Sequence, residues 1–260
     1  MTPNDERTKT YNRFVAFDLD LSRQSSDLPQ GQLNAEHEIL SQLYCLSSGD
    51  PVDILTGSFL WNYTDTALYG EHDLKFMRDY SSGRAKENLG LGYGWSSSYS
   101  TKLDRFGASA AVTLPGGAEI HFVLAADEKF YPPSGSFYQL ERLAGGYRLS
   151  HKDGNVYIYD MEGQIQSISS LDGNVIRFTH ADGRIATVSN QAGSFRFAYN
   201  ADGNLSTVTD SVGRVTTLAY DGDYLTSVTN TDGDSLRYTY DANGYLATVE
   251  NFNGEVCQRQ

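Results

Sequence analysis

The chain has 260 residues, which is enough for one large β-domain or two ordinary domains with a buried core. Apolar residues make up 39% of it and charged residues 20%, so the composition is too apolar for a disordered chain. The formal net charge of -13 argues against a nucleic-acid partner and an anionic membrane surface, because both require clustered Lys and Arg. No stretch approaches the ~20 apolar residues of a membrane span.

Tyr and Gly are unusually frequent, at 18 and 25 residues. Tyr favours strands, because its ring packs on a pleated surface while its hydroxyl reaches water. Gly supplies the positive φ that tight hairpin turns need. Together they predict an all-β protein with many turns.

Residues 1–48 are polar, and one short helix is predicted near 33–46, in the stretch LNAEHEILSQLYCL. Its Leu and Tyr residues fall near a helical period, and Asn34 is a suitable N-cap. The start of the chain, MTPNDERTKTYNRF, has no apolar stretch after its charges, so no ordinary secretory signal peptide is visible.

Residues 49–150 are predicted to form a β-rich module of irregular strands and hairpins. This segment carries both tryptophans and four of the six prolines. The stretch AAVTLPGGAEIHFVLA predicts a hairpin with its turn at Pro-Gly-Gly, residues 115–117.

Residues 151–260 contain 11 glycines, spaced nine to eleven residues apart. Most follow Asp or Asn, and Asp-Gly and Asn-Gly are strong hairpin signals. The residues between two glycines suit one strand plus half a turn. We expect structural turns at the central eight glycines: Gly173, Gly183, Gly193, Gly203, Gly213, Gly222, Gly233 and Gly244.

Two kinds of strand alternate in this region, so the period is about 20 residues, or one hairpin per repeat. One kind ends in an aromatic residue: Tyr159, His180, Tyr199, Tyr220 and Tyr240. The other carries two apolar residues three apart, as in Leu205 and Val208. Residues i and i+3 lie on opposite faces of a regular strand, so either both faces are covered or each strand bends or bulges between them. Our hypothesis is a bend that recurs in every repeat.

A single hairpin cannot bury its apolar face alone, so neighbouring repeats must cover each other. The sequence therefore predicts a curved antiparallel sheet of successive β-hairpins.

No set of side chains predicts catalysis or a cofactor. The histidines form no HxxxH or HExxH pair, and Cys45, which follows His37 by eight residues, lacks an orienting partner. Residues 96–98 are serines without the Gly-x-Ser-x-Gly elbow, and LGLGYGW (89–95) lacks the phosphate-loop form. We predict no enzyme, no catalytic residue and no cofactor.

No metal site is predicted either. Asp-Gly-Asp at 221–223 and 232–234 could bring carboxylates together, but a calcium loop needs more oxygen ligands in a fixed order. Turn chemistry accounts for these aspartates. His180 stands where other repeats have Tyr, and we interpret it as a packing residue.

Tyr199, Tyr220 and Tyr240 are candidate ligand-facing aromatics, because each is followed by Asp or Asn and a sugar site uses such groups. They also suit a cross-strand tyrosine stack within the sheet, which we favour.

The repeats resemble the Rhs or YD repeat, as in YNADGNLSTVTDSVGRVTTLAYD (199–221) and YTYDANGYLATVENFNGE (238–255). Upstream, GDPVDILTGSFLWNYTDTALYGEHDLKFMRDYSS (49–82) and LGLGYGWSSSYSTKL (89–103) look like the module of unknown function that precedes such repeats. The resemblance covers about residues 49–260.

The resemblance implies a long bacterial protein, secreted or on the cell surface, whose repeats form a spiralling β-shell around a C-terminal toxin. It also implies, for some members, binding of surface carbohydrate or protein. This chain has about five repeats and lacks the terminal self-cleavage motif and toxin domain, so it looks like the opening piece of a longer protein. Its partners would be the remaining chain, its toxin cargo or a polysaccharide. Its last strand should self-associate.

Overall fold

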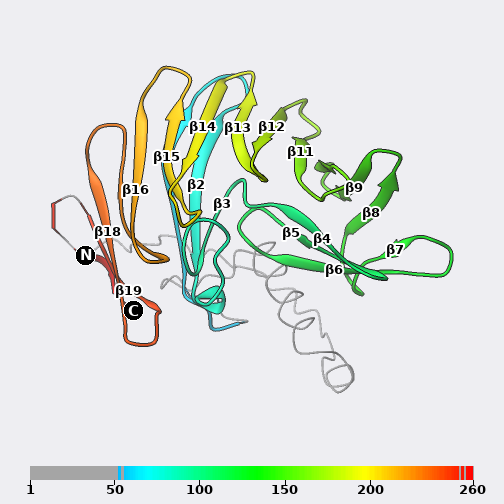
Figure 1. Ribbon diagram of the computed structural model, residues 1–260, viewed down its shortest axis with the longest axis horizontal. Helices are drawn as coiled ribbons and strands as arrows, with labels where there is room; N and C mark the ends of the chain where they lie inside the picture. Colours follow the sequence, from blue (N-terminus) through cyan, green and yellow to red (C-terminus); the bar gives the residue numbers. More distant parts are fainter. Residues whose placement is uncertain (1–51, 54–55, 252, 255, 260) are drawn as a thin grey trace, which may run out of the picture.

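The computed structural model describes residues 52–53, 56–251, 253–254 and 256–259, and these are nearly all β-structure (Figure 1). The strands form three antiparallel sheets, and the one helical element within these ranges is the short 3-10 helix η2 (Ser82–Arg84). The all-β prediction is confirmed. The helix predicted near 33–46 lies outside the described residues.

The largest sheet contains 13 strands in sequence order, and each strand pairs with its neighbours in the chain. Figure 1 shows these strands along an arc, from green at β8 to red at β19. The predicted curved sheet of successive hairpins is confirmed. The strands are β8 (Tyr138–Leu143), β9 (Gly146–His151), β10 (Val156–Tyr159), β11 (Ile165–Ser169), β12 (Val175–Ala181), β13 (Arg184–Asn190), β14 (Gly193–Tyr199), β15 (Leu205–Asp210), β16 (Val215–Asp221), β17 (Tyr224–Thr229), β18 (Ser235–Tyr240), β19 (Leu246–Glu250) and β20 (Val256–Arg259).

Five hairpins of this sheet share one irregularity, which explains the apolar residues three apart. The register shifts next to the aromatic at or near the end of the first strand, so that one residue of the second strand has no partner. Because of this bulge, Leu205 and Val208 both point into the core, 3% and 1% exposed. The predicted recurring bulge is confirmed. The extra residues are Gln166, Ala186, Ser206, Thr226 and Ala247.

The segment before the large sheet forms two smaller sheets. One consists of β1 (Leu60–Leu68), β2 (Leu74–Ser81) and β3 (Trp95–Ser97). The other consists of β4 (Lys102–Phe106), β5 (Ser109–Thr113), β6 (Glu119–Leu124) and β7 (Phe130–Tyr131). The expected Pro-Gly-Gly turn joins β5 to β6, and the Leu114 N–H donates to the Ala118 carbonyl across it at 2.6 Å. The large sheet continues before residue 151, through β8 and β9, and the boundary at 150 stays a prediction.

The three-stranded sheet β1–β2–β3 packs against one face of the large sheet, which we call the inner face. Its aromatic rings meet those of the repeats: Trp95 lies 4.9 Å from Tyr238 and Phe76 lies 5.8 Å from Phe197, centroid to centroid. Figure 1 shows β2 and β3 alongside β14 and β15. The buried side chains of both sheets form one hydrophobic cluster, so burial of the inner face depends on the segment before the repeats.

Candidate functional site on the inner face

The three candidate tyrosines form a regular ladder on the large sheet. Each hydroxyl donates to a backbone carbonyl of the preceding strand, 14 or 15 residues earlier in the chain. Tyr199 reaches Ile185 at 2.9 Å, Tyr220 reaches Leu205 at 2.8 Å, and Tyr240 reaches Leu225 at 2.8 Å. Each bond joins one hairpin to the hairpin before it. We call this arrangement the tyrosine ladder.

The ladder tyrosines are half-buried and pack against the core cluster. Burial raises the pKa of Tyr199 to about 12 and raises the pKa of Tyr220 and Tyr240 further, so all three hydroxyls keep their protons at neutral pH. The Tyr240 oxygen also accepts a bond from the Trp95 indole N–H at 2.9 Å. The bonds leave little free capacity for a ligand, which favours the packing interpretation over a ligand-facing one.

The eight predicted turn glycines all have positive φ, between 56° and 145°. At Gly213 and Gly222 an added Cβ would meet nothing within 4 Å, so only the backbone conformation requires glycine there. At Gly203 the added Cβ would lie 2.5 Å from the Arg184 guanidinium, and at Gly244 it would lie 2.6 Å from the Tyr224 hydroxyl. The Arg184 guanidinium is the far end of an exposed, flexible side chain and can move aside, so close packing is a second requirement mainly at Gly244.

A buried ion pair joins the three-stranded sheet to the repeats. Arg78 on β2 is fully buried and donates to both carboxylate oxygens of Asp65 on β1, at 2.5 and 2.8 Å. Its Nη2 also donates to the Tyr238 hydroxyl at 2.8 Å, and the guanidinium lies 4.9 Å from the Trp95 ring centroid. The two hydrogen bonds to Asp65 offset the cost of burying both charges. The contacts with the aromatic rings stabilise the guanidinium further.

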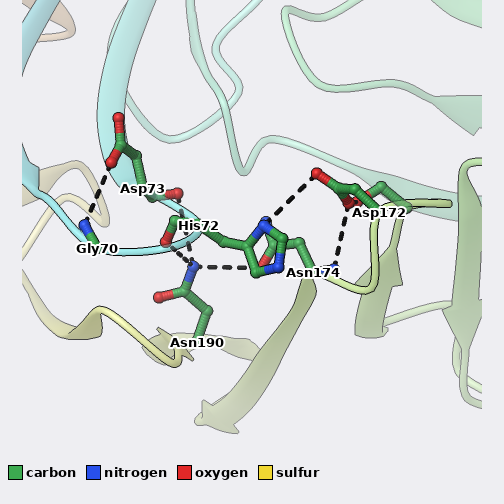
Figure 2. A network of polar contacts seen from close by, with 7 residues as sticks. Gly70, His72, Asp73, Asp172, Asn174 and Asn190 are labelled. Atoms are coloured by element: carbon green, nitrogen blue, oxygen red, sulfur yellow. Dashed lines mark hydrogen bonds and ion pairs between the residues drawn. The ribbon is translucent and has the colours of Figure 1, made fainter.

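The turn between β1 and β2 makes a second junction with the repeats, shown in Figure 2. The Asn190 side-chain amide donates to the His72 carbonyl at 2.9 Å and to the Asn174 side chain at 3.2 Å. The His72 Nδ1 lies 3.5 Å from a carboxylate oxygen of Asp172. An added Cβ at Gly70 would lie 3.2 Å from the Cβ of Ala192, so the two backbones approach closely.

A third junction lies at the other ends of the strands. The Asn88 amide donates to Asn204 at 2.9 Å and to Asp223 at 3.1 Å, and Asn204 donates to the same Asp223 oxygen at 2.8 Å. The Tyr93 N–H donates to the Asp223 carbonyl at 3.0 Å. Asp223, considered above as a metal ligand, is thus occupied by amide donors. Among the described residues no group of three or more His, Cys, Asp or Glu could hold a metal ion.

The remaining titratable candidates are scattered. His151 lies 2.9 Å from an Asp153 oxygen, and His121 lies 3.3 Å from Glu119. His180 is half-buried on β12, and burial lowers the pKa of its imidazole. His37 and Cys45 lie outside the described residues.

The junction residues, above all Arg78, Asn88 and Asn190, were not predicted from the sequence. None belongs to a catalytic or metal motif, and none repeats with the period of the array. The one available signal was the Gly-rich stretch around Gly92 and Gly94, where an added Cβ would lie 2.5 Å from the Asp223 carbonyl and from the Tyr80 ring, respectively. Such glycines mark close approach of a backbone to another element.

Comparisons with known proteins divide the chain into the segment before the repeats and the repeats themselves. Residues 158–257 match the family model described as Teneurin YD-shell, and residues 49–122 match the model described as a domain of unknown function (DUF6531). No curated protein matches the chain. Among solved structures, it is similar to a chain of "Crystal Structure of TcdB2-TccC3-Cdc42", with a TM-score of 0.33, 12% sequence identity, and coverage of 81% of this chain and 14% of that one.

The helical structure in the described ranges contains no segment with the length and hydropathy to cross a membrane. The two matched regions are those that carry the Rhs and YD motifs in the sequence, and the second coincides with the bulged hairpins and the tyrosine ladder. The resemblance to YD-repeat proteins is therefore confirmed: a segment similar to DUF6531 precedes a segment similar to the Teneurin YD-shell.

Proposed function

We propose that this chain is a non-enzymatic wall segment of the β-shell of an Rhs-type bacterial protein, secreted or on the cell surface. The observation that carries the proposal is the one bulged hairpin repeated along a single unbroken sheet, within a match to a YD-shell family model. Such a sheet can extend by adding identical units, because each unit contacts mainly its neighbours.

The inner face gives the wall a rigid support. Three junctions, at Arg78, Asn190 and Asn88, fix the three-stranded sheet across seven strands of the array, from β12 to β18. We propose that this sheet sets the curvature with which the first repeats leave the module.

The outer strands of the large sheet, β8 and β20, each have one sheet neighbour among the described residues. We propose that β20 pairs with a further strand, either of a longer Rhs-type chain or of a second copy, because a sheet edge offers unpaired backbone groups. A toxin cargo would lie within the completed shell.

Cryo-electron microscopy of the tagged protein, isolated from its own source, tests the shell. We expect this chain as part of a curved wall that encloses a volume, with β20 paired. A particle in which the repeat sheet stands alone, with no enclosed volume, would contradict the proposal. Protease treatment of intact cells, together with analysis of the medium, tests the location: protein protected until lysis would argue against secretion and surface display.

Binding of cell-surface carbohydrate or protein is a second candidate function. The observation in its favour is that Tyr199 lines a cavity of about 360 Å³. Tyr220→Ala tests the ladder itself by retention on polysaccharide and by circular dichroism. Loss of retention with an intact fold supports a binding site, and loss of the fold supports packing.

A further inference from the structure

The tyrosine ladder begins at Tyr199, and a cavity lies one repeat earlier, where His180 stands. His180 occupies the place that Tyr199, Tyr220 and Tyr240 occupy in later repeats, next to the same bulge. By the spacing of the ladder, its partner would be the Ile165 carbonyl, and the shorter imidazole makes no hydrogen bond in the described part of the chain. The cavity of about 360 Å³ is lined by both His180 and Ile165.

The cavity lies between the repeats and the preceding module. The repeats contribute Gln164, His180 and Arg184, and the module contributes Thr101 and the pair of Lys102 and Asp104. Its volume lies within the range of ligand sites, roughly 300–1,000 Å³. Leu91, Phe197 and Leu205 add apolar groups to the lining. A mixture of an apolar surface and a few polar groups is typical of small-molecule sites.

The charges around the cavity favour an anion. The Lys102 ammonium lies 2.6 Å from an Asp104 oxygen, so these two charges largely neutralise each other. The Arg184 guanidinium lies 5.4 Å from the Tyr199 ring centroid, and no carboxylate pairs with it among the described residues. In a chain of net charge -13, the lining is left with one uncompensated positive charge. A guanidinium binds a carboxylate through two parallel hydrogen bonds.

The neutral polar side chains of the cavity can form hydrogen bonds with the hydroxyl groups of a ligand. Burial lowers the pKa of the His180 imidazole, against an opposing effect of the Asp160 charge. The neutral ring can donate from one nitrogen and accept at the other. The Gln164 side chain, also without a hydrogen bond among the described residues, offers two donors and an acceptor.

We propose that this cavity binds a small hydroxylated carboxylate of sugar-acid size, with the carboxylate on Arg184 and the hydroxyls on His180 and Gln164. The proposal rests on the second candidate function, to which it adds a class of ligand, and it does not depend on the proposal that the chain forms part of a β-shell. It arises because one repeat carries His where the ladder carries Tyr.

Isothermal titration calorimetry of the whole chain with glucuronate tests the site, with glucose and acetate as controls. We expect glucuronate to bind at least about tenfold more tightly than either control, because each control keeps only one of the two groups that the site recognises. Absence of glucuronate binding, or equal affinity for glucose, would overturn the proposal. If the chain is retained on polysaccharide but does not bind glucuronate, the second candidate function is supported and this cavity is not its site.

Three variants locate the binding. His180→Tyr restores the ladder and fills the cavity, so it should abolish glucuronate binding while the melting temperature stays equal or rises. Arg184→Gln should weaken glucuronate binding about tenfold or more and leave the weak glucose binding unchanged. Arg196→Gln, an exposed arginine on β14 that does not line the cavity, is the matched control and should bind normally. Unchanged glucuronate affinity in folded His180→Tyr would refute the site.

Discussion

The repeat sheet and the three-stranded sheet that covers its inner face are stabilised by different kinds of interaction. The repeat sheet uses one solution many times: a turn glycine, a bulge and, in three repeats, a tyrosine hydroxyl on a carbonyl. The three-stranded sheet uses single contacts that never recur, such as the ion pair of Arg78 and Asp65. Damage to one repeat should therefore cost little, whereas damage to a junction should loosen the whole inner face.

The largest effect is expected at the buried ion pair. Arg78→Met leaves the Asp65 carboxylate buried without its partner, which should lower the free energy of unfolding by about 3–5 kcal/mol. Urea denaturation followed by Trp fluorescence measures it, since Trp95 lies against the guanidinium. The matched control is Arg237→Met, an exposed arginine 3.5 Å from Glu250, which should change stability by less than about 1 kcal/mol.

A second substitution separates loss of the contact from the cost of a buried charge. Arg78→Met with Asp65→Leu removes both charges, and a buried ion pair is often replaced by apolar residues at little cost. We expect the double variant to recover at least half of the lost stability. If Arg78→Met and Arg237→Met lower the free energy of unfolding equally, the buried ion pair contributes no more to stability than an ion pair on the surface of the repeats.

Two glycines at equivalent turns compare a turn that contacts β4 with a turn whose added Cβ would contact nothing. Gly163 and Gly173 have nearly the same φ, 83° and 89°, but a Cβ at Gly163 would lie 1.8 Å from the Leu103 carbonyl, and one at Gly173 would meet nothing within 4 Å. Gly173→Ala should cost about 1 kcal/mol through its backbone conformation alone. Gly163→Ala should cost about 3 kcal/mol, because β4 must also move.

Thermal denaturation of both glycine variants measures the difference. The Leu103 N–H donates to the Gly163 carbonyl at 2.9 Å, so loss of this bond would accompany the movement. Equal melting temperatures for the two variants would mean that β4 does not constrain the turn.

The same contrast explains what could be predicted from the sequence. The repeat sheet was predictable because glycine spacing and the paired apolar residues, such as Leu205 and Val208, report local backbone requirements that recur. The bulge was also predictable, because two apolar residues three positions apart would lie on opposite faces of a regular strand. The helix near 33–46 stays a prediction.

The candidate site was less predictable. The ladder tyrosines were identified, but the sequence could not decide which way Tyr220 faces, because a half-buried ring suits packing and binding alike. The cover over the inner face was missed, since contacts such as that of Arg78 with Tyr238 join residues 160 apart in the chain. No periodic signal encodes such a contact. The break at His180 was noticed, but its cavity depends on Thr101 and other residues of the module.

Asp79 provides a test of the three-stranded sheet by pH. Burial raises the pKa of this carboxyl to about 6, from an ordinary 3.8, although the charge of Arg78 opposes the shift. The folded state therefore binds the proton more tightly than the unfolded state, so this group lowers stability as the pH rises from about 4 to 6. Above pH 6 the cost is complete, at about 2–3 kcal/mol.

Asp79→Asn removes this cost. We expect the variant to be more stable than the natural chain at pH 7.5, and the difference to shrink toward zero at pH 4. Urea denaturation at several pH values measures it. A difference that does not vary with pH would show that the Asp79 carboxyl titrates normally in the folded protein.

The smallest effect is expected within the ladder. Tyr220→Phe removes one hydroxyl and leaves the Leu205 carbonyl without that donor, which should cost about 1 kcal/mol. The equivalent change at Tyr240 should cost more, because its hydroxyl also accepts from the Trp95 indole and so belongs to the cover as well as to the array. Chemical denaturation of both variants measures this order. A larger loss at Tyr220 than at Tyr240 would place the stability of the molecule in the repeated hairpins themselves, and the three-stranded sheet would then be a cover that the array can fold without.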